Sequence, residues 1–263
     1  MLAVKVTADL KVDAELLCAA VRDAGAMALG LLETTVRNWA KPDGSVVTEG
    51  DIAVNEMLHA KLQIPRPHYG WLSEESPDDA RRLNCERVWI VDPIDGTRSF
   101  VAKTDGWCIG AALVEHGRPI LSVLFRPMIN EFYFAAKGCG AWCNSSPLRP
   151  RDANTLHGAE LLGTGRAVKV LGPEIIGKNV PEIPLLLRLA YVASGQTDIA
   201  FSIGNKNDWD LAAGDLLVKE AGAILTTIDG TEMIYNTPEP WQNGMVAAGP
   251  QRHKLMLKKL ETL

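Results

Sequence analysis

Residues that form disulfides and zinc sites are scarce in this sequence. Its five cysteines are scattered and odd in number, so they predict no disulfide framework. Cys139 and Cys143 lack a second pair at zinc-finger spacing, and the five histidines include no H-x-x-x-H pair. Ordinary thiols and imidazoles are therefore expected, rather than a site for a soft metal.

An excess of positive charge and long apolar runs are missing as well. The net charge of −5 argues against binding to nucleic acid or a membrane surface by bulk attraction. It leaves room for an anionic substrate, because a bound metal can reverse the local field. No stretch of 18 uncharged apolar residues exists, and residues 13–36 are too charged for a secretory signal. We expect a cytoplasmic protein without membrane or nucleic-acid partners.

Helices and strands in the first half follow from hydrophobic spacing. Apolar residues at helical intervals predict a long helix over 13–36, and Thr48-x-x-Asp51 predicts the start of a second helix that runs to about residue 63. "HYGWLSEES" and "RVWIVDPID" read as strands that end in acidic pairs. The stretch from Trp107 to Ala136 predicts a hairpin that turns at Gly117, followed by one more strand.

The second half alternates between strand and helix patterns. A polar stretch at 144–158 is the expected junction, which divides the chain into an N-terminal α+β half (1–148) and a C-terminal α/β half (149–263). Helices are expected at about 184–194 and from Trp209 to Ala221, where Gly222 provides a C-cap.

Acidic residues gather where predicted elements end. They are Asp51, Glu74, Glu75, Asp92, Asp95 and Asp210. Carboxylates without histidine or cysteine pairs form an oxygen-rich site that suits Mg²⁺, Mn²⁺ or Ca²⁺. In "WIVDPIDGTRSF", Pro93 fixes the turn so that both aspartates and the Ile94 carbonyl can face one side, and Gly96 allows close approach of the backbone.

Each of these signals has a structural alternative. Asp-Pro-x-Asp-Gly can be only a turn, although a fixed five-residue match is expected by chance on the order of once per ten thousand sequences. Asp210 stands at a predicted helix start, where an N-cap aspartate is common, and both roles can coexist. Asp51 belongs to a capping box with Thr48. The Cys143-x5-Arg149 string is not expected to be a thiol-phosphatase loop, because Pro147 removes a backbone donor.

Three motifs together resemble the inositol monophosphatase family of Mg²⁺-dependent, Li⁺-sensitive phosphatases. They are "LSEES", "WIVDPIDGTRSF" and "WDLAAGDLLVKEAGA", in the family's order. The resemblance implies a layered αβαβα sandwich with the active site between its halves. It also implies a metal-dependent phosphomonoesterase that takes a small phosphorylated metabolite and can form a homodimer.

Roles for individual residues follow from the same resemblance. Glu74, Asp92 and the Ile94 carbonyl would hold one Mg²⁺, and Asp92 would bridge to a second ion held with Asp95 and Asp210. Two or three ions are implied, with Mn²⁺ as a substitute and Li⁺ as an inhibitor. Thr97 and Glu74 would position and deprotonate the attacking water, with support from Asp51. The backbone of Gly96 and Thr97 would bind the phosphate, and Lys41 would lie near its entrance.

The substrate stays open between inositol monophosphate and 3′-phosphoadenosine 5′-phosphate. "IPL" at 183–185 and Ser202 or Ile203 replace the small residues and the acid that inositol-hydrolysing members use. Arg98 and Lys206 could hold a second phosphate, but both can equally be surface cations. A regulatory member of the family, associated with RNA or the transcription machinery and with a weak or absent phosphatase role, is the alternative.

Overall fold

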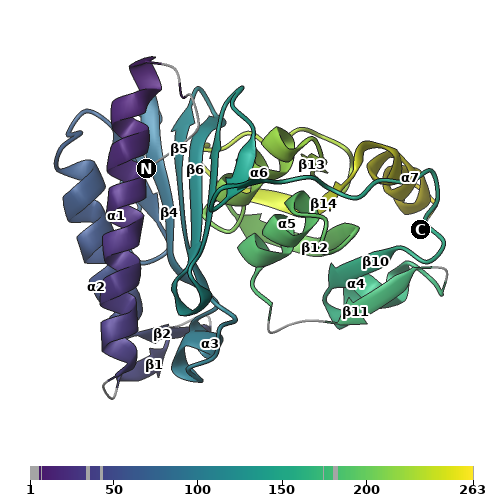
Figure 1. Cartoon of the computed structure of the whole chain (residues 1–263), viewed down its shortest axis with the longest axis horizontal. Helices are drawn as coiled ribbons and strands as arrows, with labels where there is room; N and C mark the ends of the chain where they lie inside the picture. Colours follow the sequence, from purple (N-terminus) through teal and green to yellow (C-terminus); the bar gives the residue numbers. More distant parts are fainter. Residues whose placement is uncertain are drawn as a thin grey trace.

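Five alternating layers of helices and sheets make up the chain (Figure 1). The computed structural model describes residues 6, 8–33, 36–41, 44–173, 175–179 and 183–262. The helices in these ranges are α1 (Ala8–Leu32), α2 (Glu49–Leu58), α3 (Thr97–Val101), α4 (Gly165–Val170), α5 (Leu185–Ala193), α6 (Ala212–Ala221) and α7 (Pro250–Leu260). A π-helical turn (His59–Gln63) and two 3₁₀ helices (Ala80–Asn84 and Pro127–Ile129) accompany them. The predicted αβαβα sandwich is confirmed.

The first sheet has seven strands in sequence order. They are β3 (Gly70–Ser73), β4 (Arg87–Asp95), β5 (Cys108–Glu115), β6 (Arg118–Arg126), β7 (Glu131–Ala136), β8 (Ala141–Cys143) and β9 (Ser146–Pro147). β3 and β4 are parallel, and every later pair is antiparallel. The predicted hairpin is confirmed: His116 and Gly117 turn between β5 and β6 with φ of 49° and 74°. A separate two-stranded ribbon joins β1 (Asn38–Ala40) to β2 (Val46–Thr48).

The second sheet has five strands and mixed directions. In spatial order they are β11 (Ile176–Asn179), β10 (Glu160–Gly163), β12 (Ile199–Asn207), β14 (Trp241–Ala248) and β13 (Ile224–Thr226). β11, β10 and β12 are parallel, whereas β14 is antiparallel to both of its neighbours. The first sheet thus ends at Pro147 and the second begins at Glu160, while the division at 148/149 stays a prediction.

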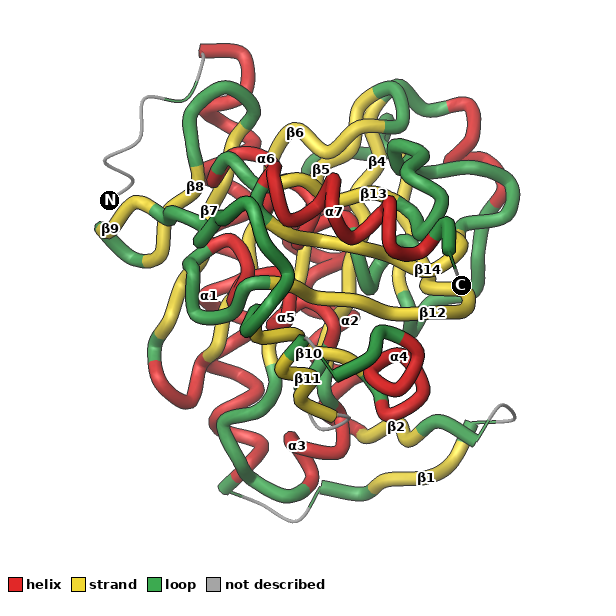
Figure 2. Tube along the Cα trace, turned by 90° about the vertical axis from the view of Figure 1, so that its right-hand side faces the viewer, coloured by secondary structure: helices red, strands yellow, loops and turns green. Residues whose placement is uncertain are grey.

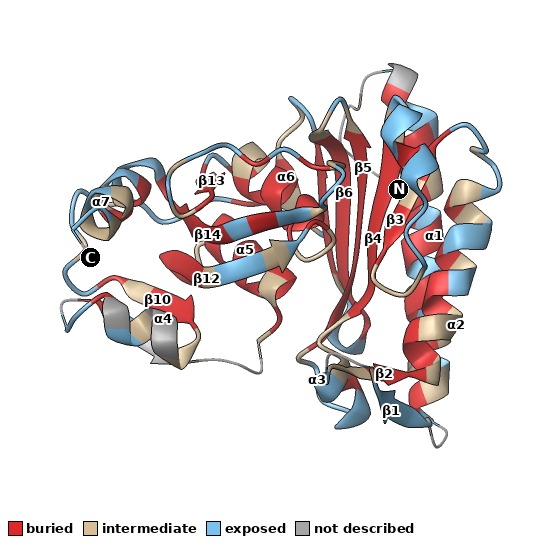
Figure 3. Ribbon diagram, turned by 180° about the vertical axis from the view of Figure 1, so that it is seen from behind, coloured by how far each residue is buried: buried red, intermediate tan, exposed pale blue. Residues whose placement is uncertain are grey.

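The hydrophobic core fills the three spaces between helices and sheets. One cluster lies between α1, α2 and the first sheet, and another between the second sheet and the outer helices α4 and α7. The largest joins both sheets through α5 and α6, which are sandwiched between them. Figure 3 shows the first sheet buried along nearly its whole length. Figure 2 shows α7 covering β13 and β14, on the side of the molecule away from α1 and α2. No helix in the described ranges combines the length and apolar character of a bilayer-crossing segment.

Two predicted helices had wrong boundaries. The first helix was expected over 13–36 but begins at Ala8 and ends at Leu32, because Leu10 extends its buried face by a turn. The helix expected from Trp209 begins only at Ala212, after a turn that Asp208 holds in place. That second difference changes the position of Asp210 and is described below.

Candidate active site

The end of β4 delivers two aspartates into a tight turn. Its pairing with β5 is regular up to Asp92, breaks over the next two residues and resumes at Asp95, as expected for a bulge at Pro93. Gly96 follows with φ of 100°, a conformation that strongly favours glycine. A Cβ atom there would lie 2.7 Å from the Gly106 carbonyl oxygen, so the turn requires glycine for close packing as well. Thr97 then begins α3.

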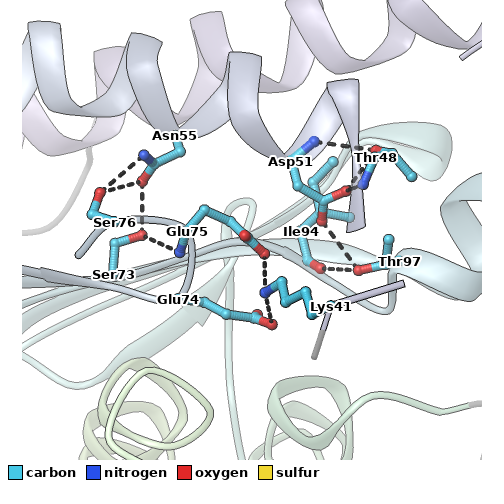
Figure 4. Close-up of polar contacts among 10 residues, drawn as sticks. All are labelled: Lys41, Thr48, Asp51, Asn55, Ser73, Glu74, Glu75, Ser76, Ile94 and Thr97. Atoms are coloured by element: carbon cyan, nitrogen blue, oxygen red, sulfur yellow. Dashed lines mark hydrogen bonds and ion pairs between the residues drawn. The ribbon is translucent and has the colours of Figure 1, made fainter. Parts of the chain in front are cut away.

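Asp51 combines the capping role with a contact to Thr97 (Figure 4). The Thr48 side chain accepts hydrogen bonds from the backbone N–H groups of Gly50 and Asp51, and Asp51 Oδ2 accepts one of 2.8 Å from the Thr48 N–H. Asp51 Oδ1 remains for the Thr97 hydroxyl at 3.1 Å, and that hydroxyl also lies 3.3 Å from the Ile94 carbonyl oxygen. The capping bond and the contact to Thr97 therefore use different oxygens of Asp51.

Lys41 bridges the two glutamates that follow β3. Its ammonium lies 2.9 Å from Glu74 Oε1 and 2.6 Å from Glu75 Oε1 (Figure 4). Burial lowers the pKa of Lys41, but the hydrogen bonds that its ammonium donates to Glu75 and Glu74 more than offset this and raise it overall, whereas burial raises the pKa of Glu75. Glu75 is only 6 % exposed, and its pairing with Lys41 holds it beside Glu74.

Asp210 lies in a turn before α6 and is not the N-cap of that helix. Leu211 occupies the cap position, and Asp210 Oδ2 instead accepts a 3.0 Å hydrogen bond from the Asn207 N–H. The N-cap alternative for Asp210 is therefore wrong. The turn leaves Asp210 on the wall of the cavity described next.

The second half of the chain also contacts Asp95. The N–H of Leu186, in the first turn of α5, donates a 2.8 Å hydrogen bond to Asp95 Oδ2. A helix N-terminus favours negative charge, so this hydrogen bond partly opposes the rise in the pKa of Asp95 that burial causes. Residues that are 91 positions apart in the chain thus meet at the site.

A cavity of about 800 Å³ collects most of the predicted residues. Its wall is formed by Ser45, Val46, Glu74, Asp92, Ile94, Asp95, Gly96, Thr97, Arg98, Ser99, Ala102, Thr104, Pro184 and Asp210. Asp51 and Lys41 contact this wall through Thr97 and Glu74. Arg98 is on the wall too, whereas Lys206 directs its ammonium to the carbonyl oxygens of Ile203 and Asn205.

Burial and the proximity of other acids together govern the electrostatics of the cavity. Burial, and then the negative charge of neighbouring acids, raises the pKa values of Asp92 and Asp95 well above their usual range. Burial followed by the charge of Glu74 raises the pKa of Asp210 to about 7. The metal-free chain therefore holds carboxyl groups that favour protonation or a cation.

The oxygen atoms on the cavity wall are of the type that binds hard divalent cations. Asp92 Oδ1 is buried and has no hydrogen-bond partner among the described residues, which leaves a lone pair directed at no protein donor. Carboxylate and carbonyl oxygens are the preferred ligands of Mg²⁺. Within the part of the chain that the structure describes, no three His, Cys, Asp or Glu side chains are already arranged around one point, and Glu74 is engaged by Lys41.

Sequence comparisons agree with the geometry. Residues 9–263 match the inositol monophosphatase family. The chain belongs to this family. It is 32% identical over 210 residues to the 3′(2′),5′-bisphosphate nucleotidase CysQ of Escherichia coli K12, which covers 78% of this chain and 85% of CysQ. It is equally identical, at 32% over 255 residues, to the Nus factor SuhB of the same strain, with 92% of each chain covered.

Solved structures of the family share the fold. One is an inositol monophosphatase/NADP phosphatase complexed with Mg²⁺ and phosphate, with a TM-score of 0.84 and 23% identity over 97% of each chain. The family consists of metal-dependent phosphomonoesterases, and two relatives with different names are equally distant from this chain. Family membership therefore leaves the substrate undecided.

Proposed function

We propose that this chain is a Mg²⁺-dependent phosphomonoesterase that hydrolyses a small phosphate ester. The observation that carries the proposal is the buried Asp92 carboxyl group. Its Oδ1 has no hydrogen-bond partner among the described residues, and the charges of Asp95 and Glu74 add to burial in raising its pKa. Such an arrangement is costly unless a cation offsets the charge. The family match supports the proposal that this chain is a phosphatase and that it uses such a cation.

The ligands proposed from the family pattern divide between two positions. Glu74, Asp92 and the Ile94 carbonyl would hold one Mg²⁺, and Asp92, Asp95 and Asp210 would hold the other. When bound, the ions supply positive charge to the phosphoryl oxygens and the attacking water. A third ion, replacement by Mn²⁺ and inhibition by Li⁺ stay part of the proposal.

The remaining groups act through hydrogen bonds. The Thr97 hydroxyl, held by Asp51 at 3.1 Å, would orient the attacking water, and Glu74 would accept its proton. Backbone N–H groups of Gly96 and Thr97, where α3 begins, would donate to the phosphate. Lys41 would limit the negative charge of Glu74 and Glu75 beside the incoming phosphate.

Arg98 favours a substrate with a second anionic group. Arg98 lies on the cavity wall, to which Pro184 also contributes. A 3′,5′-bisphosphate could place one phosphate at the proposed Mg²⁺ ions and pair the other with Arg98. Inositol monophosphate has no such second group. We therefore place 3′-phosphoadenosine 5′-phosphate ahead of inositol monophosphate.

A phosphate-release panel tests the function. It compares inositol 1-phosphate, 3′-phosphoadenosine 5′-phosphate, histidinol phosphate and fructose 1,6-bisphosphate, with Mg²⁺ or EDTA and with or without Li⁺. We expect Mg²⁺-dependent release that Asp92→Asn abolishes and that Glu86→Gln, a change at an exposed acid before β4, preserves. Arg98→Met should raise KM for the bisphosphate and leave KM for inositol 1-phosphate unchanged. No release from any ester would contradict the proposal.

A regulatory role is the second candidate. The SuhB relatives, named Nus factors, match a larger share of the chain than CysQ does. Stable capture of RNA polymerase by the Asp92→Asn variant would favour this role, and absence of capture would favour the enzyme. Homodimer formation and a cytoplasmic location stay predictions.

A further inference from the structure

A buried arginine outside the cavity connects the two halves of the molecule. Arg82 lies in the 3₁₀ helix Ala80–Asn84, and its side chain is only 1 % exposed. The neighbouring Arg81, by contrast, is 90 % exposed and pairs with Asp79 on the surface. A charge that is fully buried requires specific partners.

The partners of Arg82 come from both halves. Its Nε and Nη2 donate to the two oxygens of Asp78, at 2.6 and 2.9 Å. Its Nη1 donates to Asn236 Oδ1 at 2.8 Å and to the Thr237 carbonyl oxygen at 3.0 Å. Asn236 returns a 3.2 Å hydrogen bond from Nδ2 to the Arg82 carbonyl oxygen. One guanidinium thus fastens a loop after β3 to a loop before β14.

Asn236 leads on to the turn that carries Asp210. Its backbone N–H donates a 2.8 Å hydrogen bond to Asp208 Oδ2, while Gln242 Nε2 donates to Asp208 Oδ1 at 3.0 Å. Asp208 is fully buried, and its carbonyl oxygen accepts from the N–H groups of Leu211 and Ala212. These contacts fix the turn between β12 and α6, which explains why that helix does not begin at Trp209.

The other end of the connection leads to Glu74. Asp78 stands four residues after Glu74, and Pro77 stiffens the segment between them. Arg82 therefore links the loop of Glu74, through Asp78, with the turn of Asp210, through Asn236 and Asp208. These two acids face the same cavity from different halves of the chain.

We propose that Arg82 is a positioning residue that sets the distance between Glu74 and Asp210 and thereby the affinity of the site for divalent cations. This inference rests on the proposed metal-binding function. Stability alone does not account for the residue, because a well-packed apolar side chain is often as stabilising as a buried ion pair. An arginine fork, unlike an apolar side chain, fixes the direction of both loops.

Arg82→Met tests the inference, with Arg81→Met as the matched control. Mn²⁺ binding to the metal-free protein is measured by titration calorimetry, without substrate. Loss of a direct contact to a metal ligand typically weakens affinity by about 10–100-fold. Arg82 reaches the proposed ligands only through Asp78 and Asn236, so we expect Arg82→Met to weaken binding by about 10-fold. Arg81→Met should bind Mn²⁺ like the unaltered chain.

Hydrogen exchange of the metal-free protein supplies a readout independent of metal and activity. Arg82→Met should speed exchange in peptides covering 205–212 and 233–238 and leave β5 and β6 unaffected. If Arg82→Met does not fold, Asn236→Gly is the alternative variant. It removes both side-chain contacts to Arg82 and keeps the backbone N–H that donates to Asp208. Glycine also suits the φ of 59° at this position. Asn236→Gly should produce a smaller change in the same direction.

The outcomes separate this inference from the proposed function. Unchanged Mn²⁺ affinity, or unchanged exchange at 205–212, in both Arg82→Met and Asn236→Gly would overturn the positioning role even if the chain is a phosphatase. Weakened Mn²⁺ binding together with faster exchange would support it even if no ester in the panel is hydrolysed.

Discussion

The hydroxyl of Thr97 donates a 3.1 Å hydrogen bond to Asp51, a residue that is 46 positions away and caps another helix. The Asp51 carboxylate is buried, and burial raises its pKa despite hydrogen bonds from Thr48 and Thr97. Because the opposite oxygen of Asp51 is held by the start of α2, its carboxylate orients the Thr97 hydroxyl and is not itself free to turn.

Replacing Thr97 tests this orientation. Thr97→Val keeps the shape and removes the hydroxyl, so we expect kcat for Mg²⁺-dependent phosphate release to fall on the order of 10²–10⁴-fold. Thr97→Ser keeps the hydroxyl and should retain most of the activity. Equal rates for the two variants would mean that the hydroxyl takes no part in the reaction.

The raised pKa of Asp210 predicts how the stability of the metal-free protein depends on pH. An acid whose pKa rises from 3.8 to about 7 on folding stabilises the fold below pH 3.8, and this contribution is lost as the pH rises through 7. In Asp210→Asn the side chain stays neutral, so the variant avoids that loss of stability. Its amide oxygen can still accept the hydrogen bond from the Asn207 N–H. We expect its free energy of unfolding in EDTA to exceed that of the unaltered chain by up to about 4 kcal/mol at pH 8 and by little at pH 4.

Urea denaturation in EDTA across pH 4–8 measures this difference. Saturating Mg²⁺ should reduce or reverse the advantage of Asp210→Asn, because a bound cation stabilises the ionised carboxylate. A gain in stability that is the same at pH 4 and pH 8 would show that repulsion at Asp210 is not its cause.

Lys41 competes with a cation for Glu74. Lys41→Met should therefore tighten Mg²⁺ binding, because the glutamate loses its internal counter-charge. The metal-free protein should lose on the order of 1–3 kcal/mol, since Glu75 would be left buried without its partner. Titration calorimetry and urea denaturation measure the two effects. Arg37→Met, which removes an exposed cation paired with Glu49, is the control. Weaker Mg²⁺ binding in Lys41→Met would instead indicate that Lys41 guides Glu74 into place.

Gly96→Ala separates backbone strain from close packing. Gly96 and Gly222 have φ of 100° and 97°, so alanine costs about 1–2 kcal/mol of backbone energy at either position. Only at Gly96 would the Cβ also collide, with the Gly106 carbonyl oxygen at 2.7 Å, whereas nothing lies within 4 Å at Gly222. We expect Gly96→Ala to unfold more readily than Gly222→Ala and to lose activity on the order of 100-fold, as thermal denaturation and phosphate release would show. Equal stabilities would contradict the packing argument.

Local patterns in the sequence were sufficient to predict the turn at the centre of the site. The apolar run before Asp92, the proline between the aspartates and Gly96 all act within a few residues, so the turn could be predicted without knowledge of the fold. The capping box at Thr48 is local in the same way.

Contacts between distant residues could not be predicted. Lys41 and Glu75 are 34 residues apart, and Arg82 and Asn236 are 154 apart. The start of α6 depends on Asp208, which Asn236 and Gln242 hold from another strand and loop, so the helical pattern at Trp209–Leu211 was misleading. Tertiary hydrogen bonds overrode local propensity at this position.

The hydrogen bond from Leu186 to Asp95 has a consequence for biosynthesis. While the ribosome is still adding the first 180 residues, a nascent chain can pair β4 with β5 but has neither α5 to hold Asp95 nor the turn that supplies Asp210. The acidic centre is completed only after both later segments have emerged, so an unfinished polypeptide would lack both the Leu186 contact to Asp95 and the Asp210 wall of the cavity.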